Sequence, residues 1–363
     1  MTYYPAWSVS RLPPENIDFN YLHWVDFAFA MPTADFTLTW GDPAADPAVL
    51  QRLVAAAHSH GTKVKLSIGG WTGSMFFSPA VATDTSRHTF VSNLVTVFHK
   101  YDLDGIDIDW EYPGREGNPG NLKSPDDTVN FLAFLQLLKS SLPPTAKISA
   151  AASPVPFMGS NGEPLKDVSP FASVLDWILI MNYDTWSASA NPGPNAPLFD
   201  GCKNSSQPES SALASFGAWT SAGIPPSQLV LGLPAYGYVS RSSNDGLRTR
   251  QDTHNSSVLV AHEGSQALFR DLLYEGALVQ SAHPAGFEGA GGFEREWDDC
   301  SSTPFLRSMD TGQLVTYDDP ESLVMKSRFA KDVGMMGVNI WSVDGDTSDW
   351  HLLAAIHGSM YTE

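Results

Sequence analysis

The sequence feature that most constrains this chain is the segment YDLDGIDIDWEYP at residues 101–113. Side chains on a β-strand alternate between two faces. In an extended conformation Asp107, Asp109 and Glu111 would lie on one face, with the hydrophobic residues between them on the other. Acidic residues are poor strand formers, so a row of three needs a compensating reason. The ordinary alternative, a solvent-exposed acidic face, does not explain the large hydrophobic residues that alternate with the carboxylates.

The spacing of these carboxylates predicts unusual titration. Residues two apart on a strand are separated by roughly 7 Å. Carboxylates that close repel one another, so some of them keep a proton at a higher pH than usual. A carboxylic acid that stays protonated near neutral pH can serve as a general acid. The segment therefore indicates a strand that carries catalytic groups.

Length and charge limit the classes of protein to consider. The chain has 363 residues and a formal net charge of -19, and this length is enough for a large α/β domain with an insertion. The negative charge argues against nucleic acid or an anionic membrane as a partner. A neutral or cationic substrate fits better, and a role of the charge in solubility is the alternative. The sequence contains no apolar run of the ~20 residues that a transmembrane helix needs.

Two features bear on localisation. The sequence opens at Met1 without the charged and apolar regions of a signal peptide. This pattern fits either an intracellular protein or a secreted one whose signal peptide is absent from this sequence. Two cysteines, Cys202 and Cys300, and sequons at Asn204 and Asn255 favour secretion. Whether the cysteines pair depends on their distance in space.

Short β-rich runs alternate with amphipathic helical patterns, which is typical of parallel strands joined by helices. Eight segments are expected to be strands: residues 3–7, 24–29, 63–68, 105–110, 147–151, 177–181, 229–233 and 337–340. Eight such strands predict an α/β fold of the (β/α)8 TIM-barrel type. In that fold, catalytic residues lie at the carboxyl ends of the strands.

The alternation is interrupted between the seventh and eighth expected strands. About a hundred residues lie there, far more than one strand–helix unit needs. We expect a small α+β subdomain over residues 238–308, inserted into a barrel formed by residues 1–237 and 309–363. The insertion contains a helical pattern over residues 264–274 and the glycine-rich run GFEGAGG. That run does not follow a strand as a phosphate-binding loop would, so it is interpreted as a turn region.

Four other expected strand ends carry distinctive residues. The third ends in SIGGW, the sixth in MNYD, the seventh in LPAYG and the eighth in IWSVD, while the acidic segment fits the pattern D-x-x-D-x-D-x-E. With these motifs the chain resembles family 18 of the glycoside hydrolases over essentially its whole length, including an insertion like the chitin-insertion domain of many members. The resemblance implies a chitinase that cleaves β-1,4 links between N-acetylglucosamine units.

The resemblance also implies roles for individual residues. Glu111 would be the general acid, and the substrate's own acetamide group would be the nucleophile, so that an oxazolinium ion forms and configuration is retained. Asp109 would accept the acetamide N–H, and Asp107 would share a proton with Asp109. Tyr183 would donate to the acetamide oxygen, with Asp184 as a further polar contact.

Aromatic and apolar side chains are implied to form the sugar subsite. Trp341 matches the indole beneath the reacting sugar. The residues that match its walls are Tyr3, Phe29, Trp71, Met181 and Tyr236. For each aromatic taken alone, a place in the hydrophobic core stays open. The chain departs from the family at Tyr238, where many members with the insertion carry arginine.

We expect no cofactor and no metal site, and a monomer that binds chitin or chito-oligosaccharides but neither nucleic acid nor membrane. Two alternative functions stay open: an endo-β-N-acetylglucosaminidase that acts on N-glycans through the same acetamide chemistry, and an inactive chitin-binding lectin. The insertion favours chitin. The presence of Glu111 argues against the lectin, since lectins of this fold typically lack the terminal acid.

Overall fold

The structure, a computed structural model, describes residues 1–241, 259–282 and 286–361. The sequon at Asn255 and part of the expected insertion lie outside the described residues. The chain divides into two compact units. The first comprises Met1–Met181 and Phe216–Val230, and the second comprises Asn182–Ser215 and Leu231–Glu363.

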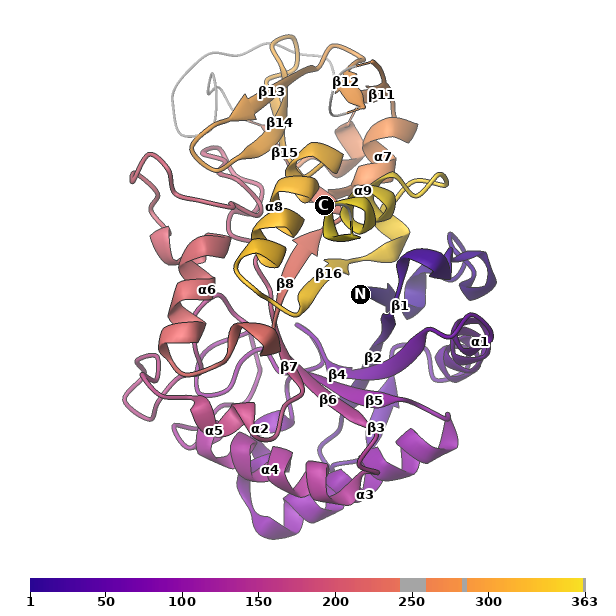
Figure 1. The fold of residues 1–363 in the computed structure, drawn as a ribbon, viewed down its shortest axis with the longest axis vertical. Coiled ribbons are helices and arrows are strands. Elements are labelled where there is room, and N and C mark those ends of the chain that lie inside the picture. Colours follow the sequence, from indigo (N-terminus) through magenta and orange to yellow (C-terminus); the bar gives the residue numbers. More distant parts are fainter. Residues whose placement is uncertain (242–258, 283–285, 362–363) are drawn as a thin grey trace. The chain divides into compact units, whose positions relative to one another are not determined.

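The fold class predicted from the sequence is confirmed: the chain forms a closed barrel of eight parallel strands with helices between them, a (β/α)8 TIM barrel (Figure 1). All eight expected strands are present, and their ends differ from the expected ones by at most three residues. The barrel strands are β1 (Thr2–Pro5), β2 (Trp24–Pro32), β4 (Lys63–Gly69), β5 (Gly105–Asp109), β6 (Lys147–Ala152), β7 (Trp177–Ile180), β8 (Leu229–Pro234) and β16 (Gly337–Trp341).

In the first unit the strands β1, β2, β4, β5, β6 and β7 pair in parallel in this order. A short strand, β3 (Leu38–Trp40), pairs with β2 in the antiparallel direction. The other elements of this unit are α1 (Asp46–Ser59), α2 (Phe77–Ala82), α3 (Asp84–Lys100), α4 (Asp127–Ser141) and α5 (Ser169–Ala172), with the 3-10 turns η1 (Ala6–Ser8), η2 (Pro14–Asn16), η3 (Phe19–Tyr21) and η5 (Pro226–Gln228).

The hydrophobic side chains of the acidic segment hold the surrounding helices. Ile106 and Ile108 on β5 are fully buried. Trp110 stacks on Phe77 of α2 with ring centroids 5.2 Å apart and meets Phe131 of α4 edge-on at 5.4 Å. Figure 1 shows these helices along the outer side of β4, β5 and β6. The outward side chains of the strand therefore fix the helical layer, while the alternate carboxylates point inward.

In the second unit, β16 lies beside β8, which begins in the first unit and ends in the second. A five-stranded antiparallel sheet of order β10-β9-β15-β14-β13 and a pair of β11 with β12 lie between them along the chain. These strands are β9 (Tyr236–Arg241), β10 (Gln266–Leu268), β11 (Leu278–Gln280), β12 (Phe287–Gly289), β13 (Glu294–Asp298), β14 (Thr303–Ser308) and β15 (Gln313–Thr316).

The remaining elements are α6 (Ala212–Ser221), which runs from the second unit into the first, α7 (Phe269–Tyr274), α8 (Pro320–Asp332), α9 (His351–Tyr361) and the turns η4 (Pro208–Ser210), η6 (Val260–His262) and η7 (Val343–Gly345). The helix expected over residues 264–274 is shorter than predicted, because Gln266–Leu268 pairs with β9 as strand β10. The boundaries of the inserted subdomain, residues 238–308, stay a prediction.

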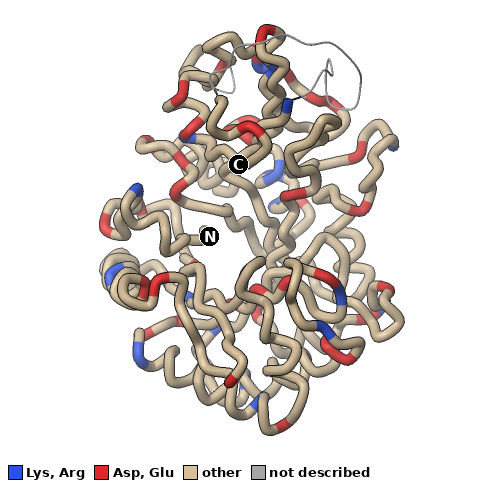
Figure 2. The backbone as a smooth tube through the Cα atoms, turned by 180° about the vertical axis from the view of Figure 1, so that it is seen from behind, with Lys and Arg blue, Asp and Glu red and all other residues tan. Residues whose placement is uncertain are grey.

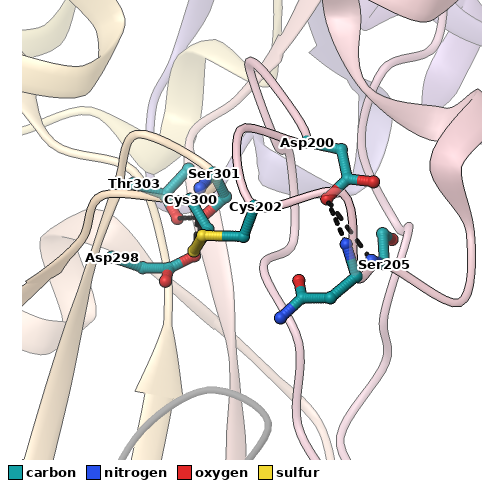
Figure 3. The surroundings of a disulfide bond; sticks show 8 residues. Asp200, Cys202, Ser205, Asp298, Cys300, Ser301 and Thr303 are labelled. Atoms are coloured by element: carbon teal, nitrogen blue, oxygen red, sulfur yellow. Dashed lines mark hydrogen bonds between the residues drawn. A yellow bond between two sulfur atoms is a disulfide. The ribbon is translucent and has the colours of Figure 1, made fainter.

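The two cysteines are bonded. Cys202 and Cys300, both in the second unit, form a disulfide with their Cα atoms 5.2 Å apart, inside the usual range (Figure 3). Figure 3 also shows polar contacts on each side of it: Asp298 accepts from the Ser301 amide at 3.1 Å, and Asp200 accepts from the Ser205 amide at 3.3 Å. The disulfide therefore joins the segment that precedes α6 to the turn between β13 and β14.

The acidic excess is distributed along the chain. Asp and Glu positions are scattered through both units in Figure 2, as are the fewer Lys and Arg positions. Among the described residues, no helix combines the length and the apolar character that a membrane span requires.

The disulfide should contribute measurably to stability. Replacing both cysteines in the double variant Cys202→Ser/Cys300→Ser opens a loop closed over a sequence separation of 98 residues. We expect the free energy of unfolding to fall by about 2–5 kcal/mol, measured by urea denaturation. The parent protein in a thiol reductant should show the same loss, and equal stability of variant and parent would contradict the prediction.

Candidate functional site

Asp107 lies in the interior of the first unit and is surrounded by hydroxyl groups. It is 1% exposed. Its Oδ2 accepts hydrogen bonds from the Tyr3 hydroxyl at 3.0 Å and the Ser67 hydroxyl at 2.7 Å, and its Oδ1 accepts from the Ser149 hydroxyl at 2.5 Å. The parallel register places Ser67 on β4 and Ser149 on β6 directly opposite Asp107. Both oxygens of this carboxylate therefore act as acceptors.

Asp109 occupies the last position of β5 and is 3% exposed. Burial raises its pKa well above the usual range, and the carboxylates of Glu111 and Asp107 raise it further. Its Oδ1 is buried without a hydrogen-bond partner among the described residues. Asp109 thus has the raised pKa that the spacing of the row predicts.

Glu111 lies beyond the end of the strand rather than on it. The sequence predicted a strand to residue 110, but the ladder ends at Asp109. The Glu111 amide donates to the Ser74 side chain at 2.9 Å, and its carbonyl accepts from the Asn121 side chain at 3.1 Å. Because side chains, rather than a neighbouring strand, form the hydrogen bonds of the Glu111 backbone, the chain can turn away from the strand direction here. Glu111 is consequently only partly buried, unlike the two aspartates before it.

The glycine pair of the SIGGW motif fits closely against the end of β5. Gly69 has a φ of +112°, and a Cβ atom there would lie 2.2 Å from the carbonyl oxygen of Asp109. The amide of Gly70 donates to the same oxygen at 2.8 Å. The Ser74 hydroxyl, which holds Glu111, lies 2.9 Å from the Gly70 carbonyl. This motif therefore shapes the backbone that presents the carboxylates.

The aromatic and apolar residues predicted for the first unit differ in exposure. Tyr3 is buried, and its ring lies 6.4 Å from that of Phe29. Met181 is also buried, with its amide bonded to Ala152 at 2.8 Å, whereas Trp71 is 48% exposed. Trp7, 64% exposed and 6.4 Å from Phe29, was not singled out from the sequence. Its only signal in the sequence was its place at the end of the first expected strand, residues 3–7.

A second cluster lies in the second unit around Asp184. The Oδ1 atom of Asp184 accepts from the Tyr236 hydroxyl at 2.5 Å and the Tyr238 hydroxyl at 2.7 Å. The surrounding protein raises the pKa of Asp184 by desolvation, while the two hydroxyl hydrogen bonds act to lower it. The ring of Tyr183 lies 6.3 Å from that of Tyr236. Gln266 donates to the Tyr238 oxygen at 2.9 Å, so this tyrosine is held from two sides.

Trp341 is the last residue of β16 and is partly buried. Its carbonyl accepts from the Ala235 amide at 2.8 Å. Ser342, the next residue, donates from its hydroxyl to Asp344 at 2.6 Å. These contacts join the LPAYG and IWSVD motifs within the second unit. The predicted site residues are thus divided between the two units.

Asp104, the first carboxylate of the D-x-x-D-x-D-x-E pattern, has structural partners. It accepts from the Val64 amide at 2.9 Å and from His58 at 2.8 Å, and it pairs with Lys63 at 2.9 Å. Asp104 therefore ties the start of β5 to α1 and β4. Over the described ranges, no group of three or more His, Cys, Asp or Glu side chains is arranged to hold a metal ion.

Several polar partners of the carboxylates were missed from the sequence. Two of them, Asp26 and Lys65, are charged and at most 1% exposed. A signal was present for Asp26, since its charge interrupts the otherwise apolar run WVDFAFA, whereas Lys65 is one of two lysines that alternate with apolar residues in KVKLSI. Ser67 and Ser149 carried no comparable signal, because serine is common on strands of every kind.

Residues 1–346 match the model of the family described as glycosyl hydrolases family 18. The chain belongs to this family. The resemblance drawn from the strand-end motifs is therefore confirmed.

Relatives within the family include chitinases. A chitinase-like effector of Moniliophthora roreri is 36% identical over 98% of this chain and 92% of that protein. Chitinase A1 of Niallia circulans is 30% identical over 78% of this chain and 40% of its own length. The crystal structure of a chitinase from Rhizomucor miehei is 33% identical, with a TM-score of 0.86, and covers 99% of this chain and 98% of that one.

The close fit at Gly69 can be tested by adding one methyl group. Gly69→Ala combines a positive φ with a clash against the backbone of Asp109, so the free energy of unfolding should fall by about 2 kcal/mol or more. Gly61→Ala is the matched control, because Gly61 has a φ of +78° but open space around it. Gly61→Ala should lower the free energy of unfolding by about 1 kcal/mol. Equal losses in chemical denaturation would contradict a close fit at Gly69.

Proposed function

We propose that the chain is a chitinase that hydrolyses β-1,4 links between N-acetylglucosamine units by substrate-assisted catalysis with retention of configuration. The observation that carries the proposal is the buried Asp109, with its raised pKa, between Asp107 and Glu111 at the end of one strand. Membership of family 18 and the similarity to the Rhizomucor miehei chitinase support it.

Glu111 is proposed as the general acid and base. It lies two residues beyond the end of β5 and is the least buried of the three carboxylates, so a substrate oxygen can reach it. It would protonate the glycosidic oxygen as the bond to the anomeric carbon breaks. After the leaving sugar departs, the Glu111 carboxylate would take a proton from the water that attacks the anomeric carbon. Ser74 and Asn121 would hold its backbone in place through both steps.

Asp109 is proposed to assist the substrate's acetamide group. The acetamide carbonyl oxygen would attack the anomeric carbon and form an oxazolinium ion, and positive charge would develop on the amide nitrogen. The buried Oδ1 of Asp109 is an acceptor available for the acetamide N–H. The other oxygen would share a proton with Asp107, whose hydroxyl partners keep it in position.

The cluster of the second unit is also proposed to contact the substrate. Tyr183 would donate to the acetamide oxygen, and Asp184, held by two tyrosine hydroxyls, would be a further polar contact. Trp341 is proposed as the indole beneath the reacting sugar. The proposed subsite walls are Tyr3, Phe29, Trp71, Met181 and Tyr236, of which Trp71 is the most exposed.

A second candidate function is binding of chito-oligosaccharides without turnover. The name of the Moniliophthora roreri relative, chitinase-like effector, favours this possibility. The intact D-x-x-D-x-D-x-E pattern favours hydrolysis. The two candidates differ in a single measurement, which is release of shorter oligosaccharides by the unmodified protein.

Secretion is proposed on the basis of the disulfide between Cys202 and Cys300, because such bonds persist mainly in oxidising compartments. We propose further that the protein acts as a monomer. The inserted subdomain over residues 238–308 is proposed to form part of the chitin-binding surface.

Removing the proton donor tests the proposed acid. Glu111→Gln keeps the size of the side chain but cannot donate a proton of suitable acidity, so kcat on chitotetraose or longer oligomers should fall at least ~100-fold. Binding of the oligomer, measured by calorimetry, should change little, because the contacts remain.

Glu116→Gln is the matched control, since Glu116 is exposed and pairs with Lys123 at the surface. It should leave kcat unchanged. Turnover by Glu111→Gln at the parental rate would refute the acid assignment. Tight binding with no turnover in the unmodified protein would favour the second candidate function.

The substrate-assisted mechanism requires an acetamide group on the reacting sugar. A fully deacetylated chito-oligosaccharide lacks the internal nucleophile, so its hydrolysis should be at least ~100-fold slower than that of the acetylated oligomer of equal length. Chromatography of the products measures both rates, and anomer detection should show the β-anomer first. Comparable rates on both oligomers, or an inverted first product, would rule out the assisted mechanism.

A further inference from the structure

A buried lysine lies beside the carboxylate row. Lys65 on β4 is fully buried, and its Nζ lies 2.8 Å from Oδ1 of Asp26, which is 1% exposed. The same Nζ is 3.7 Å from Oδ1 of Asp107 and 4.4 Å from the centre of the Trp177 ring. Register places Asp26 on β2 directly opposite Lys65. One cation therefore stands between two buried aspartates and against an aromatic face.

Lys65 also fixes the direction of a neighbouring hydrogen bond. Its ammonium group donates to the Ser149 hydroxyl oxygen. An ammonium group has donors only, so the Ser149 oxygen must be the acceptor in that contact. The single proton of Ser149 is then directed to Asp107, which it meets at 2.5 Å. The four groups form a relay in which Lys65 contacts Asp26 and reaches Asp107 through Ser149.

Stability alone does not explain such an arrangement. Burying two ions costs hydration free energy, and this cost can exceed the free energy gained from their attraction. Well-packed hydrophobic residues can therefore often replace a buried ion pair without loss of stability. The polar partners of Lys65 are the two aspartates and Ser149, so the ion pair is directed at the carboxylate row. The charges are therefore better explained by their effect on the neighbouring carboxylates.

We propose that Lys65 and Asp26 are positioning residues of the carboxylate row, which hold Asp107 as an acceptor and so leave the shared proton on Asp109. The proposal rests on the proposed hydrolase function. Without Lys65, the Ser149 hydroxyl would be free to turn and Asp107 would lose its nearby cation, so the proton would be divided differently between the two aspartates.

Other groups face this cluster. Asp107 also receives hydrogen bonds from Tyr3 and Ser67. Asp109 faces the charges of Glu111, Asp107 and Asp26. The amino group of Met1 faces both Asp26 and Lys65, and burial lowers the pKa of that amine to about 6. These groups are present in all the variants below, so differences among variants report on the substituted residues.

The test is the pH profile of kcat/KM on a chito-oligosaccharide. Lys65→Met removes the cation and makes a second protonation of the aspartate pair easier, so the acidic limb should move to higher pH by about 1 unit. Asp26→Asn removes an anion that competes for Lys65, so the limb should move to lower pH. The charge-balanced double variant Lys65→Met/Asp26→Asn should keep an upward shift smaller than that of Lys65→Met, because Ser149 has still lost its donor.

The chain provides a matched control pair. Lys326 and Asp318 in the second unit form another buried ion pair, at most 1% exposed, and are not among the groups that face Asp109. Lys326→Met/Asp318→Asn should alter thermal stability and leave the acidic limb in place. If the acidic limb of Lys65→Met stays where it is in the unmodified protein, the positioning role is overturned. If Lys65→Met does not fold, the same outcome in Lys65→Met/Asp26→Asn overturns it.

Failure of the proposed function is distinguishable from failure of this inference. If the unmodified protein hydrolyses no oligosaccharide, the function fails, and carboxyl 13C titration of aspartate in the same variants then tests the relay. The Asp109 signal should titrate at a different pH in Lys65→Met than in the unmodified protein. An identical titration in the two proteins would overturn the inference.

Discussion

The interior of the barrel can hold carboxylates only because neighbouring strands deliver hydrogen-bond donors to them. Asp107 lies fully out of water, where an unpaired charge would be very costly. Three hydroxyl groups, from β1, β4 and β6, reach its two oxygens. The two serines meet Asp107 because parallel strands in register place them directly opposite it, whereas Tyr3 reaches it through its long side chain. The arrangement of the first unit thus depends on agreement between strand register and polar chemistry.

Asp109, on the same strand, has fewer hydrogen-bond donors around its carboxylate than Asp107. Two residues further on, the hydroxyl donors are absent from one of its oxygens, and its neighbours are other acids. Two similar side chains on one face therefore have different hydrogen-bonding surroundings. The glycines of SIGGW contribute by letting the backbone of β4 approach the end of β5 closely, so that Glu111 follows at the strand's exit.

Much of this could be predicted from the sequence. Alternation and turn residues located all eight barrel strands, and the strand-end motifs located the carboxylates, because both are local patterns. Details that depend on distant residues were not accessible. The ladder stops at Asp109 because the side chain of Ser74, far away in the sequence, captures the amide of Glu111. Likewise, the local sequence pattern of residues 266–268 indicates a helix, but in the structure these residues pair with β9 as a strand.

The hydrogen bonds around Tyr238 have a consequence for the conditions under which the second cluster keeps its shape. Asp184 is held there by two phenols, and one of these is held in turn by an amide of Gln266. None of these donors carries a charge, whereas a guanidinium in the same position would attract the carboxylate through a field that dissolved ions screen. The geometry around Asp184 should thus be indifferent to ionic strength, from dilute buffer to brine.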